Sequence, residues 1–350
     1  MTHSWPKAAT TLPFSCAECY NSLPKGRKTI RRREFIALAG ASVTWPFAAL
    51  AQEPGRTYRI GSLYPAQQPD VNTAFFDELR RHGFIEGKNL KSEFRSTALH
   101  PDRLSEYIAE LVNARVDVIL ATGISVIRAV QEATKTIPIL ALEDDLLGSG
   151  LVNSLARPDG NTTGVQMLVG DLDGKRQDIL IEAMPGLRRM AAIADSNQTK
   201  TKLDALQEAA RARNIELSIY RIASREEISA VLDTAKNSGA TALNVLASPM
   251  FFGFRQLINE RALVVRLPAM YFFPEMAEEG GFAAYGSGMI DIWRDIHARQ
   301  LIQLLRGTKV ADIPVEQPTK FELWINLKTA KAMGVAVPEG LLVRADKVIE

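Results

Sequence analysis

The sequence has very little cysteine and histidine, with two cysteines and four histidines in 350 residues. The C-x-x-C pair of Cys16 and Cys19 lacks the second pair or histidine cluster that a metal or redox site needs. Both cysteines lie in a leader that we expect to be removed, so the remaining chain has no disulfide, no thiolate nucleophile and no lipid-modified cysteine. The histidines, at positions 3, 82, 100 and 297, are scattered, and each is expected to be a solvated residue rather than a ligand or a base.

The glycine motifs of nucleotide-binding and hydrolytic enzymes are also missing. The first expected strand runs into Gly61 and then Pro65 instead of G-x-G-x-x-G, and the pattern that begins at Gly148 has Asn153 in place of its third glycine. Neither G-x-x-x-x-G-K-[ST] nor G-x-S-x-G occurs. The acidic cluster 143–145 has no neighbouring histidine. We therefore expect no cofactor, no metal and no enzymatic activity.

An excess of positive charge is absent from most of the chain. Residues 1–51 carry seven basic and two acidic side chains, whereas the rest carries 35 basic and 38 acidic ones. The basic character of the whole sequence therefore comes from its first 51 residues. The remainder offers no electrostatic reason to bind nucleic acid.

The first 51 residues have the pattern of an export signal. Three arginines, Arg31 to Arg33, precede an uncharged apolar run from Phe35 to Ala51 that ends in an A-x-A cleavage signature. The arginines followed by x-Phe-Ile resemble the twin-arginine export motif. A membrane anchor is disfavoured because the run has about 17 residues and contains Pro46, whereas a spanning helix needs roughly 20. We expect cleavage near Ala51, a periplasmic mature protein, and an extension over residues 1–28.

From residue 58 onward, short apolar runs alternate with segments of helical period, which predicts an α/β fold. Seven strands are expected, at 59–64, 117–121, 138–142, 190–194, 217–222, 242–247 and 268–273. Helices between them are indicated by apolar stripes, such as the one that contains Leu104, Ile108 and Leu111. Most strands are apolar enough to be buried on both faces, as in parallel sheets.

A turn-rich stretch follows Asp145 and a new strand–helix series begins at Met190, which predicts two doubly wound parallel-sheet lobes. Turn-forming residues suggest that the chain crosses between the lobes at 148–165, at 285–288 and at 313–318. Lobe 1 is then expected to comprise residues 57–150 and 287–315, and lobe 2 residues 160–285 and 319–350. Three crossings form a natural hinge.

Polar and aromatic residues follow the expected strands, at the edge where open α/β sheets bind ligands. The segment Gly123-Ile124-Ser125 opens a helix whose free N–H groups suit a carboxylate. Asp145 ends the next strand and could bind a cationic group. Aromatic and sulfur-containing side chains also lie at strand ends and could contact a flat ligand, although packing in a core is an equal alternative; they are Tyr64, Met250 and Tyr271.

Several stretches of the sequence resemble the substrate-binding proteins of ABC transporters. They are YRIGSLYP at 58–65, GFIEGKN at 83–89, GSGLV at 148–152, ARPDGNTTG at 156–164 and IPVEQPTKFELWINL at 313–327. The likeness covers nearly all of 57–350 and is to the branch of the type I periplasmic-binding fold whose better-known members bind aromatic amino acids such as tryptophan.

This resemblance implies a ligand site between the lobes. Tyr64, Gly123, Ser125 and Asp145 match positions that line the first lobe, and the second lobe is matched by Asn197, Ser248 and Tyr271. The sequence departs from the family pattern at 195–197, where Asp-Ser-Asn replaces a W-N-P-like turn, at 145–146, and at 248–249, where Ser-Pro replaces Asp-Pro. Loss of the second acid removes one candidate partner for an α-amino group.

The resemblance further implies that the protein captures a small organic solute, such as an amino acid or another carboxylate, and delivers it to an ABC permease in the inner membrane. A monomer is expected. Two alternatives remain open at this point. The same fold serves as a periplasmic sensing module for a membrane signalling partner, and an exported enzyme would need a nucleophile and base that the sequence does not offer.

Overall fold

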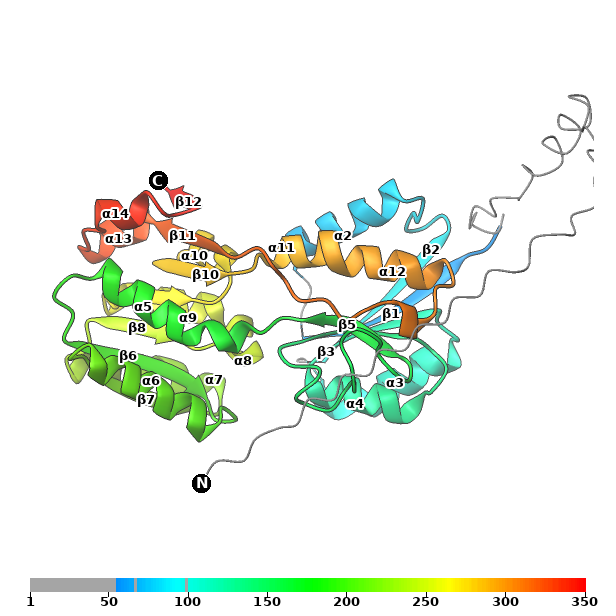
Figure 1. The fold of residues 1–350 in the computed structure, drawn as a ribbon, viewed down its shortest axis with the longest axis horizontal. Helices are drawn as coiled ribbons and strands as arrows, with labels where there is room; N and C mark the ends of the chain where they lie inside the picture. The colour runs from blue at the N-terminus through cyan, green and yellow to red at the C-terminus, as the bar shows by residue number, and fades with distance from the viewer. Residues whose placement is uncertain (1–54, 66–67, 98–99) are drawn as a thin grey trace, which may run out of the picture. The chain divides into compact units, whose positions relative to one another are not determined.

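The computed structural model describes residues 55–65, 68–97 and 100–350. The expected signal peptide, including Cys16 and Cys19, lies outside the described residues. Among the described residues, no helix is both long enough and apolar enough to cross a membrane. Figure 1 shows two sheets, each with helices on both faces, and all neighbouring strands are parallel except one pair in the second sheet, so the predicted α/β class is confirmed.

The first sheet has five parallel strands in the order β2-β1-β3-β4-β5. Their bounds are β1 Tyr58–Tyr64, β2 Leu90–Ser96, β3 Val118–Thr122, β4 Ile139–Glu143 and β5 Thr162–Gln166. Alternate residues of the central strands face opposite layers: Leu120 packs in the cluster that contains Val71 and Phe75 of helix α2 (Pro69–Arg81), whereas Ile119 packs against α3 (Leu104–Asn113) and α4 (Ile124–Ala133). Burial on both faces explains why these strands read as continuous apolar runs.

A long helical segment completes the first lobe beside α2. It consists of α11 (Met289–Asp291), a π-helical stretch (Ile292–His297) and α12 (Ala298–Leu305). His297 has no exposed surface, and both ring nitrogens are buried without a hydrogen-bond partner in the described part of the chain. The prediction that His297 is solvated is therefore wrong. Its position four residues after Trp293 puts both rings on the same buried face, with their centroids 4.6 Å apart.

The second sheet has seven strands in the order β12-β11-β10-β9-β8-β6-β7. All its neighbouring strands are parallel except β10 and β11, which pair antiparallel. Helices of opposite layers cover its two faces, with α7 and α9 on one and α5 and α6 on the other. The strands are β6 Arg189–Asp195, β7 Glu216–Ile222, β8 Ala242–Val245, β9 Ala269–Tyr271, β10 Ala283–Gly286, β11 Glu322–Asn326 and β12 Lys347–Ile349.

The remaining α-helices belong to the second lobe. They are α5 Asp173–Ala183, α6 Lys200–Ala212, α7 Arg225–Asn237, α8 Pro249–Gly253, α9 Arg255–Val264, α10 Pro274–Glu278, α13 Leu327–Met333 and α14 Glu339–Leu342. Three short 3₁₀ turns span Pro101–Arg103, Val169–Leu172 and Val310–Asp312.

The chain passes between the two lobes three times, and the first passage lies later than the sequence indicated. Residues 162–166 form β5, which pairs with β4 in the first sheet, whereas the sequence had placed them in the second lobe. The first crossing is therefore 167–172, between β5 and α5. The second crossing is 287–288, and the third follows Glu316, whose N–H donates to the carbonyl of Gly164.

Gly164 explains how β5 docks on the first sheet. Its φ is +147°, and a Cβ at this position would lie 1.9 Å from the carbonyl oxygen of Ala141 on β4. Its own carbonyl accepts hydrogen bonds from the Gln300 side chain at 3.0 Å and from Glu316 N–H at 3.0 Å. Only glycine allows this close approach of three backbone segments.

Candidate ligand-binding site

The Gly123–Ser125 segment lies where the sequence placed it, at the carboxyl end of β3. Gly123 precedes α4 with φ +96°, a conformation that favours glycine, and no side chain caps the helix. Ile124 and Ser125 are exposed in the first turn of this ten-residue helix. The first N–H groups of α4 therefore have no intrahelical partner, and together with the helix dipole they suit a carboxylate.

Asp145 also lies at this edge, but its side chain has a local role. The carboxylate is exposed, and Oδ1 accepts a hydrogen bond of 2.7 Å from the N–H of Gly148. A Cβ at Gly148 would lie 2.0 Å from Asp145 Oδ2, so a larger residue there would displace the Asp145 side chain. Asp145 thus stabilises the turn after β4, and its contact with a solute stays a prediction.

An aromatic pocket that the sequence did not predict lies at the ends of β1 and β2. The ring of Tyr64 meets that of Trp293 edge to face with centroids 4.9 Å apart, and Trp293 meets Phe75 in the same way at 5.2 Å. Burial raises the pKa of the Tyr64 hydroxyl well above its ordinary value. The cavity has a volume of about 20 Å³, lined by Ser62, Tyr64, Asn72, Phe75, Phe76, Ser92, Phe94 and Trp293. This volume holds water rather than an aromatic ring.

On the second lobe, the carboxylate of Asp195, which the sequence did not mark as a ligand residue, occupies the carboxyl edge of the sheet. Asp195 ends β6 and is half-buried. Its Oδ2 accepts a hydrogen bond of 2.7 Å from the hydroxyl of Ser248, and its Oδ1 accepts one of 3.0 Å from Asn197 N–H. The second lobe therefore does present an acid at this edge, at the end of β6 rather than of β8. Two of the predicted residues, Asn197 and Ser248, hold it in place.

Three hydrogen bonds fix the loop that carries Asp195. Gln198 Nε2 donates to the carbonyl of Ala247 at 3.0 Å. Arg221 donates to the carbonyls of Ser196 and Gln198, at 2.8 and 2.6 Å. No lysine or arginine of the described ranges forms an ion pair with Asp195. The loop thus presents a preorganised carboxylate without a cationic partner.

Met250 and Tyr271, the two other second-lobe predictions, differ in exposure. Met250 is half-buried on α8, whose first turn Ser248 caps by accepting the Met250 N–H. Tyr271 is fully buried, and its ring fits against Gly281, where a Cβ would lie 2.6 Å from it. Burial also raises the pKa of its hydroxyl. This position in the core argues against Tyr271 as a direct contact of a solute.

The predicted residues of each lobe share one edge of their own sheet. Tyr64 ends β1, and Gly123 and Asp145 follow β3 and β4 of the same sheet. Asn197 and Ser248 follow two neighbouring strands of the second sheet. Because carboxyl ends of parallel strands meet at the same edge, each set forms one half of a candidate site. The carboxylates of Glu143 and Asp144, next to Asp145, have pKa values raised by burial.

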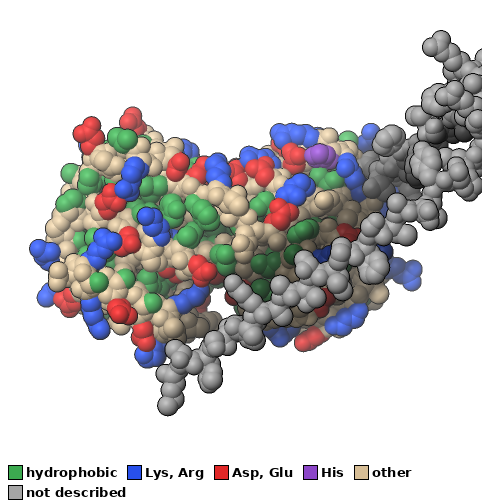
Figure 2. Space-filling view, in the orientation of Figure 1, with side chains coloured by type: hydrophobic (Ala, Val, Ile, Leu, Met, Phe, Trp, Pro, Cys, Tyr) green, Lys and Arg blue, Asp and Glu red, His purple; other side chains and the backbone are tan. Residues whose placement is uncertain are grey.

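Lysine and arginine side chains are mixed with aspartate and glutamate over the face seen in Figure 2. This arrangement matches the near balance of charge in the sequence beyond residue 51. A field of one sign that would attract a polyanion is not visible on that face.

Comparison with known proteins identifies the class. Residues 68–349 match the family described as ABC transporter substrate binding protein. The chain therefore belongs to that family, which is one of solute-binding proteins and not of enzymes, as the sequence predicted.

Individual relatives agree with this assignment. A tyrosine-binding protein of Clostridioides difficile is 25% identical over 285 residues, which cover 78% of this chain and 80% of the relative. The crystal structure of an ABC domain in complex with L-Trp from Streptococcus pneumoniae superposes with a TM-score of 0.72 at 22% identity, over 84% of this chain and 100% of that one. A conserved domain protein of Vibrio cholerae gives a TM-score of 0.74 at 20% identity, with the same coverage. At these identities the structures establish the fold alone.

Proposed function

We propose that the protein captures a small solute carrying a carboxylate and a cationic amine, such as an amino acid, between its two lobes in the periplasm. The observation that carries the proposal is the pairing of complementary groups. The first lobe offers the N–H groups of the first turn of α4, which have no intrahelical partner, beside the N–H of Gly123 that donates to Glu143, and the second offers the Asp195 carboxylate without a cationic partner in the described residues. Relatives that bind tyrosine or carry L-Trp support an amino-acid ligand. Membership of the ABC transporter substrate-binding family supports delivery of the solute to an inner-membrane ABC permease.

The mechanism is ligand-dependent closure. A solute that touches both lobes makes all its contacts only in the closed form, so its differential affinity shifts the equilibrium toward closure. Burial of about 150 Å² of apolar solute surface supplies on the order of 4 kcal/mol at roughly 25 cal/mol/Å², so polar anchoring must supply the rest. The permease then recognises the closed surface.

Two measurements test the proposal. Mass spectrometry of protein purified from the periplasm should detect a co-purifying amine-bearing carboxylate. Calorimetry with L-tyrosine, L-tryptophan and a panel of other amino acids should then find at least one solute that binds stoichiometrically. If no small molecule co-purifies and no member of a broad metabolite library raises the melting temperature, the proposed function is wrong.

Asp195→Asn should weaken binding of an amine-bearing solute about tenfold to a hundredfold, because a charge-assisted hydrogen bond is replaced by a neutral one. The fold should be retained, since asparagine can still accept from Ser248. Asp204→Asn is the matched control, because Asp204 pairs with Lys200 on the exposed face of α6. Equal calorimetric affinities for wild type and Asp195→Asn would remove Asp195 from the site.

The double change Arg32→Lys and Arg33→Lys should block or slow export, because a twin-arginine receptor reads the guanidinium pair rather than charge alone. Cell fractionation should then show uncleaved precursor in the cytoplasm. Normal periplasmic yield of the double variant would instead indicate the general secretory route.

A further inference from the structure

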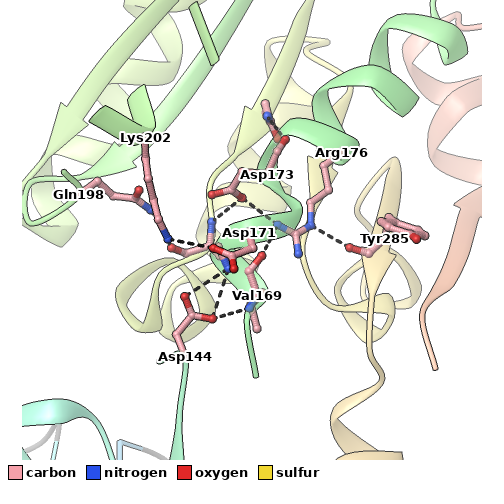
Figure 3. Close-up of polar contacts among 11 residues, drawn as sticks. Asp144, Val169, Asp171, Asp173, Arg176, Gln198, Lys202 and Tyr285 are labelled. Atoms are coloured by element: carbon pink, nitrogen blue, oxygen red, sulfur yellow. Dashed lines mark hydrogen bonds and ion pairs between the residues drawn. The ribbon is translucent and has the colours of Figure 1, made fainter. Parts of the chain in front are cut away.

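The guanidinium of Arg176 lies at the junction of two of the three crossings. Arg176 is on α5, at the start of the second lobe, and has no exposed surface. Figure 3 shows its side chain between Val169 and Tyr285. Nη1 donates to the carbonyl of Val169 at 2.9 Å, and Nε donates to the carbonyl of Tyr285 at 2.8 Å. Val169 belongs to the first crossing, and Tyr285 lies two residues before the second.

Asp173 holds this guanidinium in place from the preceding turn of the same helix. Its Oδ1 accepts from Arg176 Nη1 at 2.8 Å and also from the N–H of Ala247, just after β8, at 3.2 Å. The main-chain carbonyl of Asp173 accepts from the buried side chain of Asn244 on β8 at 3.4 Å. The ion pair is therefore fixed to the body of the second lobe.

The segments that carry Val169 and Tyr285 are also restricted by their backbones, and the segment of Val169 is held by the first lobe as well. Asp144, which follows β4, accepts hydrogen bonds from the N–H groups of Val169 and Gly170. Leu168 has φ +50°, a left-handed conformation that is strained for leucine. Gly286 admits no side chain, because a Cβ there would lie 2.1 Å from the carbonyl oxygen of Phe272. Val169 is thus bound to the first lobe through its N–H and to the second through its carbonyl.

We infer that Arg176 is a positioning residue of the hinge, which fastens the first and second crossings to the second lobe so that they move as one body. One planar guanidinium can bridge two carbonyls and a carboxylate, whereas a lysine ammonium is a single point charge that cannot reproduce the fork. This role of Arg176 rests on the proposed function, because a hinge serves the protein only if its two lobes close on a solute. The test uses ligand-free protein, so the hinge role of Arg176 can fail while solute capture holds, and the reverse.

The test is native-state hydrogen exchange on the mature protein. In Arg176→Lys, the amides of 167–170 and of 285–290 should exchange at least tenfold faster than in wild type, while amides of β6 and β8 keep their rates. Arg213→Lys is the control, because Arg213 forms an exposed ion pair with Asp178. Faster exchange in one segment only would overturn the coupling, and uniformly faster exchange in both sheets would assign Arg176 a purely structural role.

Wild-type protein provides a second readout in case the variant fails to fold. As the urea concentration is raised below the unfolding transition, the exchange rates of the amides at 167–170 and at 285–290 should increase with the same dependence on urea. One guanidinium must release both segments. Two different dependences would contradict the inference without any substitution.

Discussion

Replacing Gly164 by alanine should lower the free energy of unfolding by about 3 kcal/mol, a large fraction of the stability of a typical domain. The new Cβ would lie 1.9 Å from the carbonyl oxygen of Ala141, and that oxygen belongs to the backbone of a central strand, which cannot move without breaking the β4–β5 ladder. The φ of +147° adds strain for any residue other than glycine. Urea unfolding followed by circular dichroism measures the loss.

Gly174→Ala is the matched control for this experiment. Gly174 lies in α5, and nothing is within 4 Å of a Cβ added there. Alanine should therefore stabilise the helix by up to about 1 kcal/mol. If Gly164→Ala loses less than about 1 kcal/mol, β5 does not pack against β4 as described.

Replacing His297 by phenylalanine should make the protein markedly more resistant to acid. Complete burial lowers the pKa of His297 to about 3, so the folded state keeps the ring neutral. The unfolded state protonates it near pH 6.5, so this group destabilises the fold progressively from about pH 6.5 down to about pH 3, by roughly 1.4 kcal/mol per pH unit. Between pH 6.5 and 4.5 the variant should gain about 2 to 3 kcal/mol relative to wild type.

The effect is expressed relative to wild type because protonation of Asp173 changes the free energy of unfolding in the opposite direction. Burial raises the pKa of Asp173 to about 6, so its protonation favours the folded state as the pH falls from about 6 to about 4. This contribution is present in both proteins and cancels in their difference. Phenylalanine is larger than histidine and costs some packing energy, which is independent of pH.

Denaturant unfolding at several pH values measures the difference, with His82→Gln as the control because His82 is exposed and contacts Glu78 at the surface. A difference between His297→Phe and wild type that stays constant from pH 7 to pH 4.5 would contradict the assignment of His297 as a neutral buried ring.

The sequence predicted β1, β3, β4 and β6 to β9, but missed β2, β11 and β12, which carry charged residues, and the four-residue strand β10. It missed β5, because Thr162, Thr163 and Gly164 follow a run of turn formers, and the strand exists only because glycine permits the close approach to β4. It also misplaced His297, although its spacing from Trp293 and Leu301 puts it on the apolar stripe. In both cases tertiary packing overrode the structure that the local composition indicates.

The candidate site was predictable only in outline. Strand ends locate the edge at which ligand groups gather, and this rule placed Gly123, Asp145 and Ser248. This rule does not predict which way a side chain points. It therefore could not show that Asp145 accepts a hydrogen bond from Gly148 or that Ser248 donates one to Asp195. The aromatic pocket was missed because its rings come from segments far apart in the sequence, such as Phe75 and Trp293.

Small-angle X-ray scattering with and without a saturating solute tests the central claim most directly. The solute should be the amino acid that calorimetry shows to bind most tightly, and the proposed two-lobe capture predicts that the radius of gyration falls measurably when it is added. Asp195→Asn, studied at the same solute concentration below its weakened dissociation constant, should keep the larger value. Superimposable curves for the free and saturated wild-type protein, while calorimetry still reports binding, would contradict capture by closure of the two lobes.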